Sequence, residues 1–196
     1  LMERIAEKFE EQGRHKLLLL TKSDNFRILD RSNPFEQTIV SFSINAPEVW
    51  GRWEHKTVPP EKRIEAAKMI SDIGYETRIR IDPIFPIENW HREYSELLHL
   101  LLSKFTPERI TLGTPRGLAK TLMFSEDRSW AQYFTEDSAW GKKIPSILRE
   151  EIYLFIYQTL DSLGFDKSKV SICKETRAMW EQLGLDYANC RCNCVW

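Results

Sequence analysis

The residues of this chain that could carry out chemistry lie at the ends of three strand-like runs, at 17–25, 38–45 and 77–83. Each run joins aliphatic or β-branched residues to hydroxyl, amide or charged groups. In β/α barrels, the carboxyl ends of successive parallel strands carry the chemistry. The pattern therefore predicts part of an enzyme in which these polar groups meet at the mouth of a barrel, the end where the carboxyl ends of the strands lie.

The second run has polar side chains at alternate positions. Ser41, Ser43 and Asn45 are separated by apolar residues, so in a strand they point to one side. Hydroxyl and amide groups placed in this way suit hydrogen bonding to a ribose or an amino acid moiety. Lys22 ends the first run as a cation that could pair with a carboxylate or a phosphate. The plainer alternatives are a solvated strand end for Lys22, an ordinary polar strand face, and a turn cap at Asn45.

Arg78, Arg80 and Asp82 share one side of the third run. Charges that point into a barrel are costly unless they are paired or bind a ligand. We therefore expect Arg80 and Asp82 to face each other near the mouth. A purely structural ion pair is the alternative, and Asp82 before Pro83 could be turn chemistry. In the loop before the next helix, Glu54 and His55 could act as acid and base, although such a loop pair is more often solvated.

The tail of the chain has the pattern C-x-C-x-C, formed by Cys190, Cys192 and Cys194. In an extended conformation the three sulfurs would face one way and could bind a soft metal such as zinc, or an accessory cluster, with Cys173 as a fourth ligand. The alternative is a set of reduced, inert thiols.

Alternating strand and helix patterns predict the elements that position these groups. Strands are expected at 16–22, 37–44, 76–82, 108–112 and 169–173. Helices are expected at 2–12, 90–104, 148–163 and 175–183, and a further one opens at Pro59-Pro60-Glu61 and runs through Ile70 or Ile73. Connections too long for hairpins predict a parallel sheet with right-handed crossovers. Residues 115–147 are expected to form irregular loops with short helices.

The composition is ordinary for a globular protein, with 196 residues, 42% hydrophobic residues and a formal net charge of -1. The charge balance gives no global basic excess of the kind that indicates a nucleic-acid partner. The longest apolar stretches, 17–20 and 152–157, are far shorter than the roughly 20 residues of a membrane span. We therefore expect a cytoplasmic protein with no membrane partner.

A series of short motifs runs through the chain in a fixed order. Leu-Thr-Lys-Ser-Asp-Asn at 20–25 precedes Val-Ser-Phe-Ser-Ile-Asn at 40–45 and Arg-Ile-Asp-Pro-Ile-Phe-Pro at 80–86. The motifs that complete the order are Trp53-Glu54-His55, the helix start at 60–67, Gly74-Tyr75, residues 111–116 and residues 173–176. In order and spacing, these motifs resemble the spore photoproduct lyase family of radical S-adenosylmethionine (SAM) enzymes.

This resemblance implies an α/β fold, a partial (β/α) barrel of the radical SAM type with parallel strands and crossover helices. It implies a [4Fe-4S] cluster and SAM, whose cleavage yields a 5′-deoxyadenosyl radical that reverses a thymine-dimer lesion, with lesion-bearing DNA as partner. Relatives of unknown substrate share the pattern, so a radical SAM enzyme with a different substrate is the alternative. The positions that match the family place SAM binding at Lys22, Ser41, Ser43, Asn45, Arg80 and Asp82, and substrate binding at Arg116 and Lys120.

The chain departs from the family at the cluster. The family holds it with C-x-x-x-C-x-x-C, and no such spacing occurs here. We therefore expect the cluster ligands upstream of Leu1, on a missing amino-terminal half of the barrel, and no activity from this chain alone. Residues 1–116 would be the second half of the barrel. Residues 117–196 would be a helical extension with a final strand and a Cys-rich tail, packed on the same domain. No hydrogen-donating residue is assigned.

Two other functions remain open from the residues alone. A non-catalytic nucleic-acid-binding module would use Lys142, Lys143, Arg149 and the Trp-rich segment 115–147 as a cationic stacking surface. A metal-stabilised interaction domain would be built on the terminal cysteines.

Overall fold

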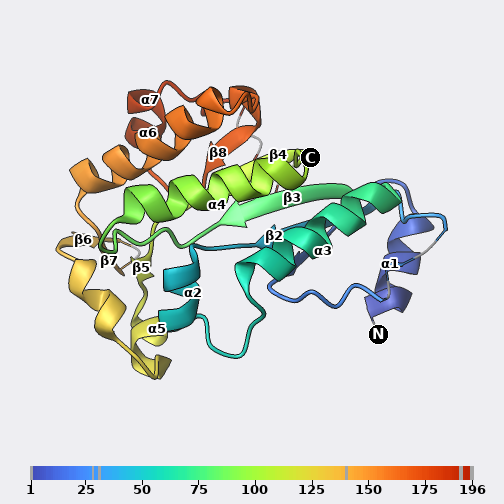
Figure 1. Ribbon diagram of the computed structural model, residues 1–196, viewed down its shortest axis with the longest axis horizontal. Helices are drawn as coiled ribbons and strands as arrows, with labels where there is room; N and C mark the ends of the chain where they lie inside the picture. Colours follow the sequence, from blue (N-terminus) through green and yellow to red (C-terminus); the bar gives the residue numbers. More distant parts are fainter. Residues whose placement is uncertain (1, 28, 31, 140, 190–191, 195–196) are drawn as a thin grey trace.

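A five-stranded parallel sheet forms the centre of the computed structural model, which describes residues 2–27, 29–30, 32–139, 141–189 and 192–194. The strands are, in spatial order, β1 (Leu17–Thr21), β2 (Thr38–Ser43), β3 (Glu76–Ile81), β4 (Arg109–Leu112) and β8 (Val170–Ile172). Each neighbouring pair is parallel. All five predicted strands and their parallel arrangement are therefore confirmed (Figure 1).

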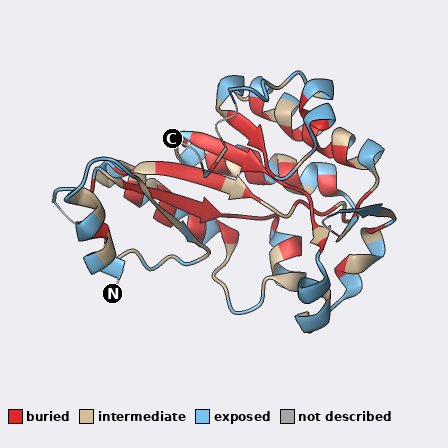
Figure 2. Ribbon diagram, turned by 180° about the vertical axis from the view of Figure 1, so that it is seen from behind, coloured by how far each residue is buried: buried red, intermediate tan, exposed pale blue. Residues whose placement is uncertain are grey.

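Three long helices between the strands, α3 (Pro60–Ile73), α4 (Trp90–Lys104) and α6 (Ser146–Ser162), lie along one face of this sheet (Figure 1). The other helices around the sheet are α1 (Met2–Glu10), α2 (Pro47–Trp53) and α7 (Arg177–Gln182). Among the long helices, α3 begins at a proline, which fits the first turn of a helix, and ends at Gly74, whose φ of 108° favours glycine. Seen from behind, the buried strands of the sheet lie in front of the helices (Figure 2).

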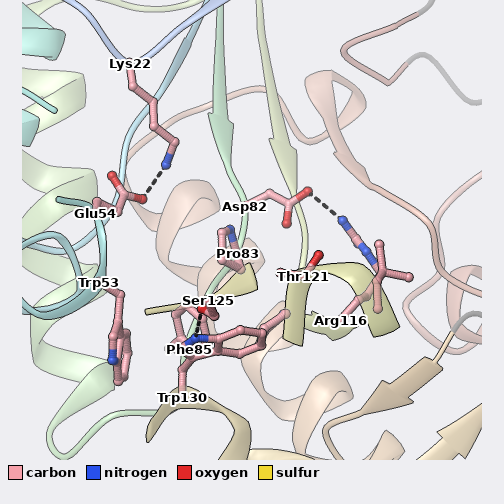
Figure 3. A pocket seen from close by; sticks show the side chains of 12 residues that line it. Lys22, Trp53, Glu54, Asp82, Pro83, Phe85, Arg116, Thr121, Ser125 and Trp130 are labelled. Carbon is pink, nitrogen blue, oxygen red and sulfur yellow. Dashed lines mark hydrogen bonds and ion pairs between the residues drawn. The ribbon is translucent and has the colours of Figure 1, made fainter. Parts of the chain in front are cut away.

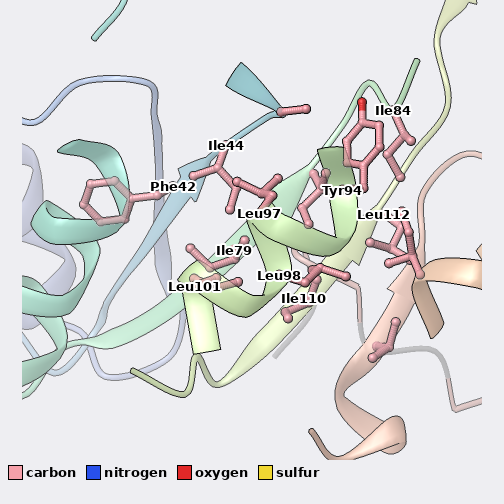
Figure 4. Packing of buried hydrophobic residues seen from close by; sticks show 14 of the residues in the cluster. Phe42, Ile44, Ile79, Ile84, Tyr94, Leu97, Leu98, Leu101, Ile110 and Leu112 are labelled. Carbon is pink, nitrogen blue, oxygen red and sulfur yellow. The ribbon is translucent and has the colours of Figure 1, made fainter. Parts of the chain in front are cut away.

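Strand alternation separates an apolar face from a polar face. On the helix side, Ile79, Ile110 and Leu112 pack against α4, including Tyr94 and Leu98 (Figure 4). The residues between them point to the opposite, inner face, which carries Ser41, Ser43, Arg78, Arg80, Thr111 and Ser171. The packed apolar face therefore fixes the strands so that their polar side chains line the inner side.

A second, three-stranded antiparallel sheet was not predicted. It has the order β5 (Arg116–Gly117), β7 (Gly141–Lys143), β6 (Glu136–Ser138), next to α5 (Ala119–Phe124) and the 3-10 turn η1 (Ser129–Tyr133). Two glycines allow the strands to touch, because a Cβ on Gly141 would lie 2.5 Å from the carbonyl oxygen of Gly117. The expected irregular segment therefore contains a small folded unit beside the carboxyl ends of the main strands.

None of the helices in the described part of the chain combines the length and apolar character needed to cross a bilayer.

Candidate functional site

The carboxyl ends of β1, β2 and β3 lie side by side at one end of the sheet. Ser43 is in register with Arg80, and the amide of Ile44 donates to the carbonyl of Arg80 at 3.0 Å. Lys22 follows β1 and joins the same end through an ion pair with Glu54. The structure thus brings Lys22, Ser43 and Arg80 together, as expected from the parallel arrangement.

The first charged cluster is centred on Glu54, which follows α2. Its carboxylate accepts hydrogen bonds from Lys22, from the Asn45 amide at 3.2 Å and from Arg63 Nη1 at 2.7 Å. Burial alone would raise the pKa of Glu54, but the two cations outweigh it and lower that pKa. His55 is exposed. Glu54 is therefore an ionised partner of two cations and not half of an acid-base pair.

Arg63, on α3, was not identified from the sequence. Its side chain is 0% exposed, and its remaining hydrogen bonds go to the carbonyls of Val58 (2.7 Å) and Ser43 (2.9 Å) and to the hydroxyl of Thr57 (2.7 Å). It therefore links α3, the loop before it and the end of β2. The available signal was an arginine among the apolar positions of an amphipathic helix.

The second charged cluster is centred on Asp82, which follows β3 and precedes a cis peptide bond to Pro83. Its Oδ2 accepts from Arg80 and lies 3.3 Å from Arg116 Nη2. Arg80 also donates to the Cys173 sulfur at 3.2 Å. Burial would lower the pKa of Arg80, but Asp82 and the Cys173 sulfur raise it. The expected pairing of Arg80 with Asp82 is found, and Arg116 joins it.

Gly113, at the end of β4, forms the surface under Asp82. A Cβ at this position would lie 2.6 Å from Asp82 Cγ and 2.8 Å from Oδ2, which is closer than real Cβ atoms approach other groups. Its backbone is also tied down on both sides, to Ile81 at 3.0 Å and to Ile84 at 2.7 Å. Because Gly113 has no side chain, the Asp82 carboxylate can lie directly against its Cα.

A pocket of about 360 Å³ separates the two clusters. Lys22 and Glu54 lie on one side and Asp82 and Arg116 on the other, with three aromatic rings at the base (Figure 3). Lys22 and Arg63 share one carboxylate, whereas Arg80 and Arg116 share the other. Of these four cations, Lys22 and Arg116 line the pocket, where each is placed to pair with an anionic group of a ligand.

Asn45 and Ser41, two of the residues expected to contact a ligand, have hydrogen-bond partners within the protein. The Asn45 amide group makes four hydrogen bonds, to Glu54, the Pro83 carbonyl, the Tyr94 hydroxyl and the Ala46 amide, so its bonding capacity is used.

Ser41 lies deeper on the inner face, where it donates to Asn193 Oδ1 at 2.8 Å. Arg78 Nη1 donates to the carbonyl oxygen of Asn193 at 2.8 Å, so Ser41 and Arg78 both bind this carboxyl-terminal residue. Lys120 is exposed on α5.

The structure describes two of the three terminal cysteines that were expected to bind a metal, Cys192 and Cys194. Cys190 lies outside the described residues. Cys192 and Cys194 flank Asn193, which is 1% exposed against the sheet, and the amide of Cys194 lies 3.5 Å from the Cys192 sulfur. Burial is the main cause that raises the pKa of Cys194. Within the described ranges, no group of three His, Cys, Asp or Glu residues could hold a metal ion, so these residues do not fit an iron-sulfur cluster.

The sequence profile of the spore photoproduct lyase family matches residues 1–113. The chain belongs to the spore photoproduct lyase family. It is 48% identical over 61 residues to the spore photoproduct lyase of Clostridium acetobutylicum, covering 31% of this chain and 18% of that protein. It is 33% identical over 100 residues to that of Bacillus subtilis, covering 51% of this chain and 29% of that protein.

Solved structures show the same fold. A spore photoproduct lyase complexed with dinucleoside spore photoproduct superposes with a TM-score of 0.70 at 17% identity, covering 87% of this chain and 54% of that one. Streptococcus suis SuiB bound to S-adenosylmethionine gives 0.54 at 13% identity, with coverages of 97% and 39%. The partial barrel of the radical SAM type is therefore confirmed. The chain spans about half the length of the solved lyases that it matches.

Proposed function

We propose that this chain forms the SAM-binding and substrate-binding part of a radical SAM lyase that repairs a thymine-dimer lesion in DNA. Family membership supports the reaction class, and one solved relative carries bound AdoMet together with dinucleoside spore photoproduct. The observation that carries the proposal is the pocket at the strand ends, lined by the ion pair of Lys22 with Glu54 on one side and that of Arg116 with Asp82 on the other.

The residues of the mouth take distinct roles in this proposal. When bound, SAM supplies the radical that abstracts a hydrogen atom from the lesion. Lys22 pairs with the carboxylate of SAM, and Ser43 donates a hydrogen bond from the same strand edge. Arg80 and Asp82 orient the ligand, whereas Ser41 and Asn45 act as positioning residues through their bonds to Asn193, Glu54 and Tyr94. Arg116 and Lys120 contact phosphates of the DNA.

The cluster is assigned to another part of the enzyme. The described residues of this chain do not fit it, and the chain covers 54% of a solved relative. We therefore expect no lyase turnover from this chain alone. Residues 1–116 act as the second half of the barrel, and residues 117–196 as an extension whose β8 joins the same sheet.

The burial of two basic residues argues against the alternative of a non-catalytic nucleic-acid-binding module with a cationic stacking surface. Lys143 and Arg149 are 7% and 5% exposed. Both pair with the buried carboxylate of Glu175, at 3.8 Å and 3.2 Å, and Arg149 also pairs with Glu136 at 3.2 Å. These cations therefore connect β7, α6 and the end of β8 and do not form a basic surface.

SAM binding can be tested on the chain itself by nuclear magnetic resonance. Titration of the isotope-labelled chain with SAM is expected to shift the backbone amides that follow β1, β2 and β3. Lys22→Met should weaken this binding by about 10-fold or more, because a charge-assisted bond is lost. Lys16→Met is the matched control at the opposite end of β1, where the ammonium group bonds the Glu36 carbonyl. Shifts confined to other surfaces, or equal effects of both variants, would contradict the proposal.

A further inference from the structure

We propose that Glu175 is a positioning residue, which holds Arg116 in place for a phosphate group of the substrate. This inference rests on the proposed function, in which Arg116 contacts the DNA, and adds the residue that fixes this contact from behind. Glu175 follows β8, and its side chain is 2% exposed. It is not among the residues that line the pocket, so it can act on a ligand only through another residue.

One oxygen of the Glu175 carboxylate meets donors from three segments of the chain. Oε1 accepts hydrogen bonds from the Tyr153 hydroxyl at 3.0 Å and from the Thr114 hydroxyl at 3.3 Å, and it lies 3.2 Å from Arg149 Nε. Burial, and then the Glu175 carboxylate, raise the pKa of Tyr153, so its hydroxyl keeps the proton that it donates. The same hydroxyl accepts from the Thr114 amide at 3.1 Å. Glu175 therefore fixes Thr114 both directly and through Tyr153.

The other oxygen reaches the strand that pairs with Arg116. Lys143 Nζ lies 3.8 Å from Glu175 Oε2, and Lys143 is in register with Arg116 in the antiparallel pair of β5 and β7. Lys143 and Arg149 are both buried, so the loss of the carboxylate that they share would be costly. Arg116 is therefore held along the chain by Thr114 and across the sheet by Lys143, and Glu175 binds both of these residues.

The Arg116 guanidinium reaches from this frame to the second charged cluster (Figure 3). Its Nη2 lies 3.3 Å from Asp82 Oδ2, and its Nη1 donates to the Cys173 carbonyl at 3.5 Å. Cys173 is two residues before Glu175, so the end of β8 contacts Arg116 directly as well. A guanidinium has five N–H donors, and these two contacts leave donors for a phosphate oxygen.

The test measures binding of a fluorescent single-stranded thymidine oligonucleotide by fluorescence anisotropy at several salt concentrations. Arg116→Ala should weaken binding by about 10-fold, because a charge-assisted bond is lost. It should also lower the slope of log affinity against log salt by about 0.7, the value for one phosphate of a single strand.

Glu175→Gln should act in the same direction, with binding weaker by about 3-fold or more and a smaller salt slope. A mere change of charge predicts the opposite, because removing a carboxylate strengthens attraction to a polyanion. In an Arg116→Ala background, Glu175→Gln should have almost no further effect on affinity, because the residue through which it acts is absent.

A second readout follows Arg116 itself by nuclear magnetic resonance. In a chain that contains isotope-labelled arginine, the Nε–Hε signal of Arg116 is assigned from its loss in Arg116→Ala, and it should shift or broaden in Glu175→Gln. Glu136→Gln is the matched control. It also removes a carboxylate that pairs with Arg149, but this carboxylate bonds the Ser146 amide at the start of α6. Glu136→Gln should leave the Arg116 signal and the salt slope unchanged.

The outcomes separate the positioning role from the proposed function. An unchanged Arg116 signal or an unchanged slope in Glu175→Gln would overturn the positioning role and leave Glu175 as a structural anchor. Additive effects in the double variant, or equal effects of Glu136→Gln and Glu175→Gln, overturn it as well. If Arg116→Ala binds as the unmodified chain does, or if neither binds, the phosphate contact in the proposed function is wrong and the positioning role falls with it.

Discussion

Replacing Arg63 by alanine is expected to lower the free energy of unfolding by about 3–5 kcal/mol, the cost typical of removing one partner from a buried ion pair. The guanidinium is 0% exposed and bonds Glu54, two carbonyls and the Thr57 hydroxyl. Its loss would leave the buried Glu54 carboxylate without one of the two cations that pair with it, so that Lys22 alone among the described residues would balance its charge. Urea unfolding followed by circular dichroism measures the change.

Arg52→Ala is the matched control for this measurement. Arg52 pairs with Glu48 one turn earlier on α2, where its side chain is 50% exposed. Exposed pairs of this kind contribute about 0–1 kcal/mol. Arg63→Lys should recover part of the stability, because an ammonium group keeps the charge and loses the planar fork. Equal costs for Arg52→Ala and Arg63→Ala would contradict the role of Arg63 as the buried link between α3 and β2.

The Gly113→Ala variant should displace Asp82 and disrupt the second charged cluster. The new Cβ would lie 2.6–2.9 Å from the Asp82 carboxyl group, so the carboxylate must move away from Arg80 and Arg116. Overpacking of this kind costs about 1–3 kcal/mol, and SAM affinity should fall along with stability. Urea unfolding and the SAM titration measure the two effects.

A double-mutant cycle isolates this contact. In an Asp82→Ala background the added methyl group no longer meets the carboxylate, so Gly113→Ala should cost much less there than in the unmodified chain. Gly51→Ala is a control on α2, where a Cβ meets nothing within 4 Å, and it should raise stability slightly. If Gly113→Ala costs the same in both backgrounds, the proposed contact with Asp82 is wrong.

The arrangement of the mouth could be predicted because it follows from local pattern. Alternation fixed which side of each strand is polar, and parallel pairing then placed Ser43 beside Arg80. The partners of these groups could not be predicted in the same way. Asn193 reaches Ser41 from 152 residues away, and no periodicity reports such a contact.

Arg63 and the small antiparallel sheet were missed for different physical reasons. The helical pattern shows that α3 is amphipathic, but it does not show that a charged residue on the buried face has found a carboxylate. Strands of two or three residues, such as β5 and β7, are too short for alternation to distinguish them from loops. Asn45 illustrates a further limit, since the same amide can bind a ligand or, as here, the Tyr94 hydroxyl.

The central claim, that the pocket between the two charged clusters is the SAM site, is tested most directly by a crystal structure of the chain grown with millimolar SAM. We expect electron density for SAM in the pocket, beside the carboxyl ends of β2 and β3. The carboxylate of SAM should lie within hydrogen-bonding distance of Lys22. Ligand density on another surface, with this pocket filled by solvent, would contradict the account.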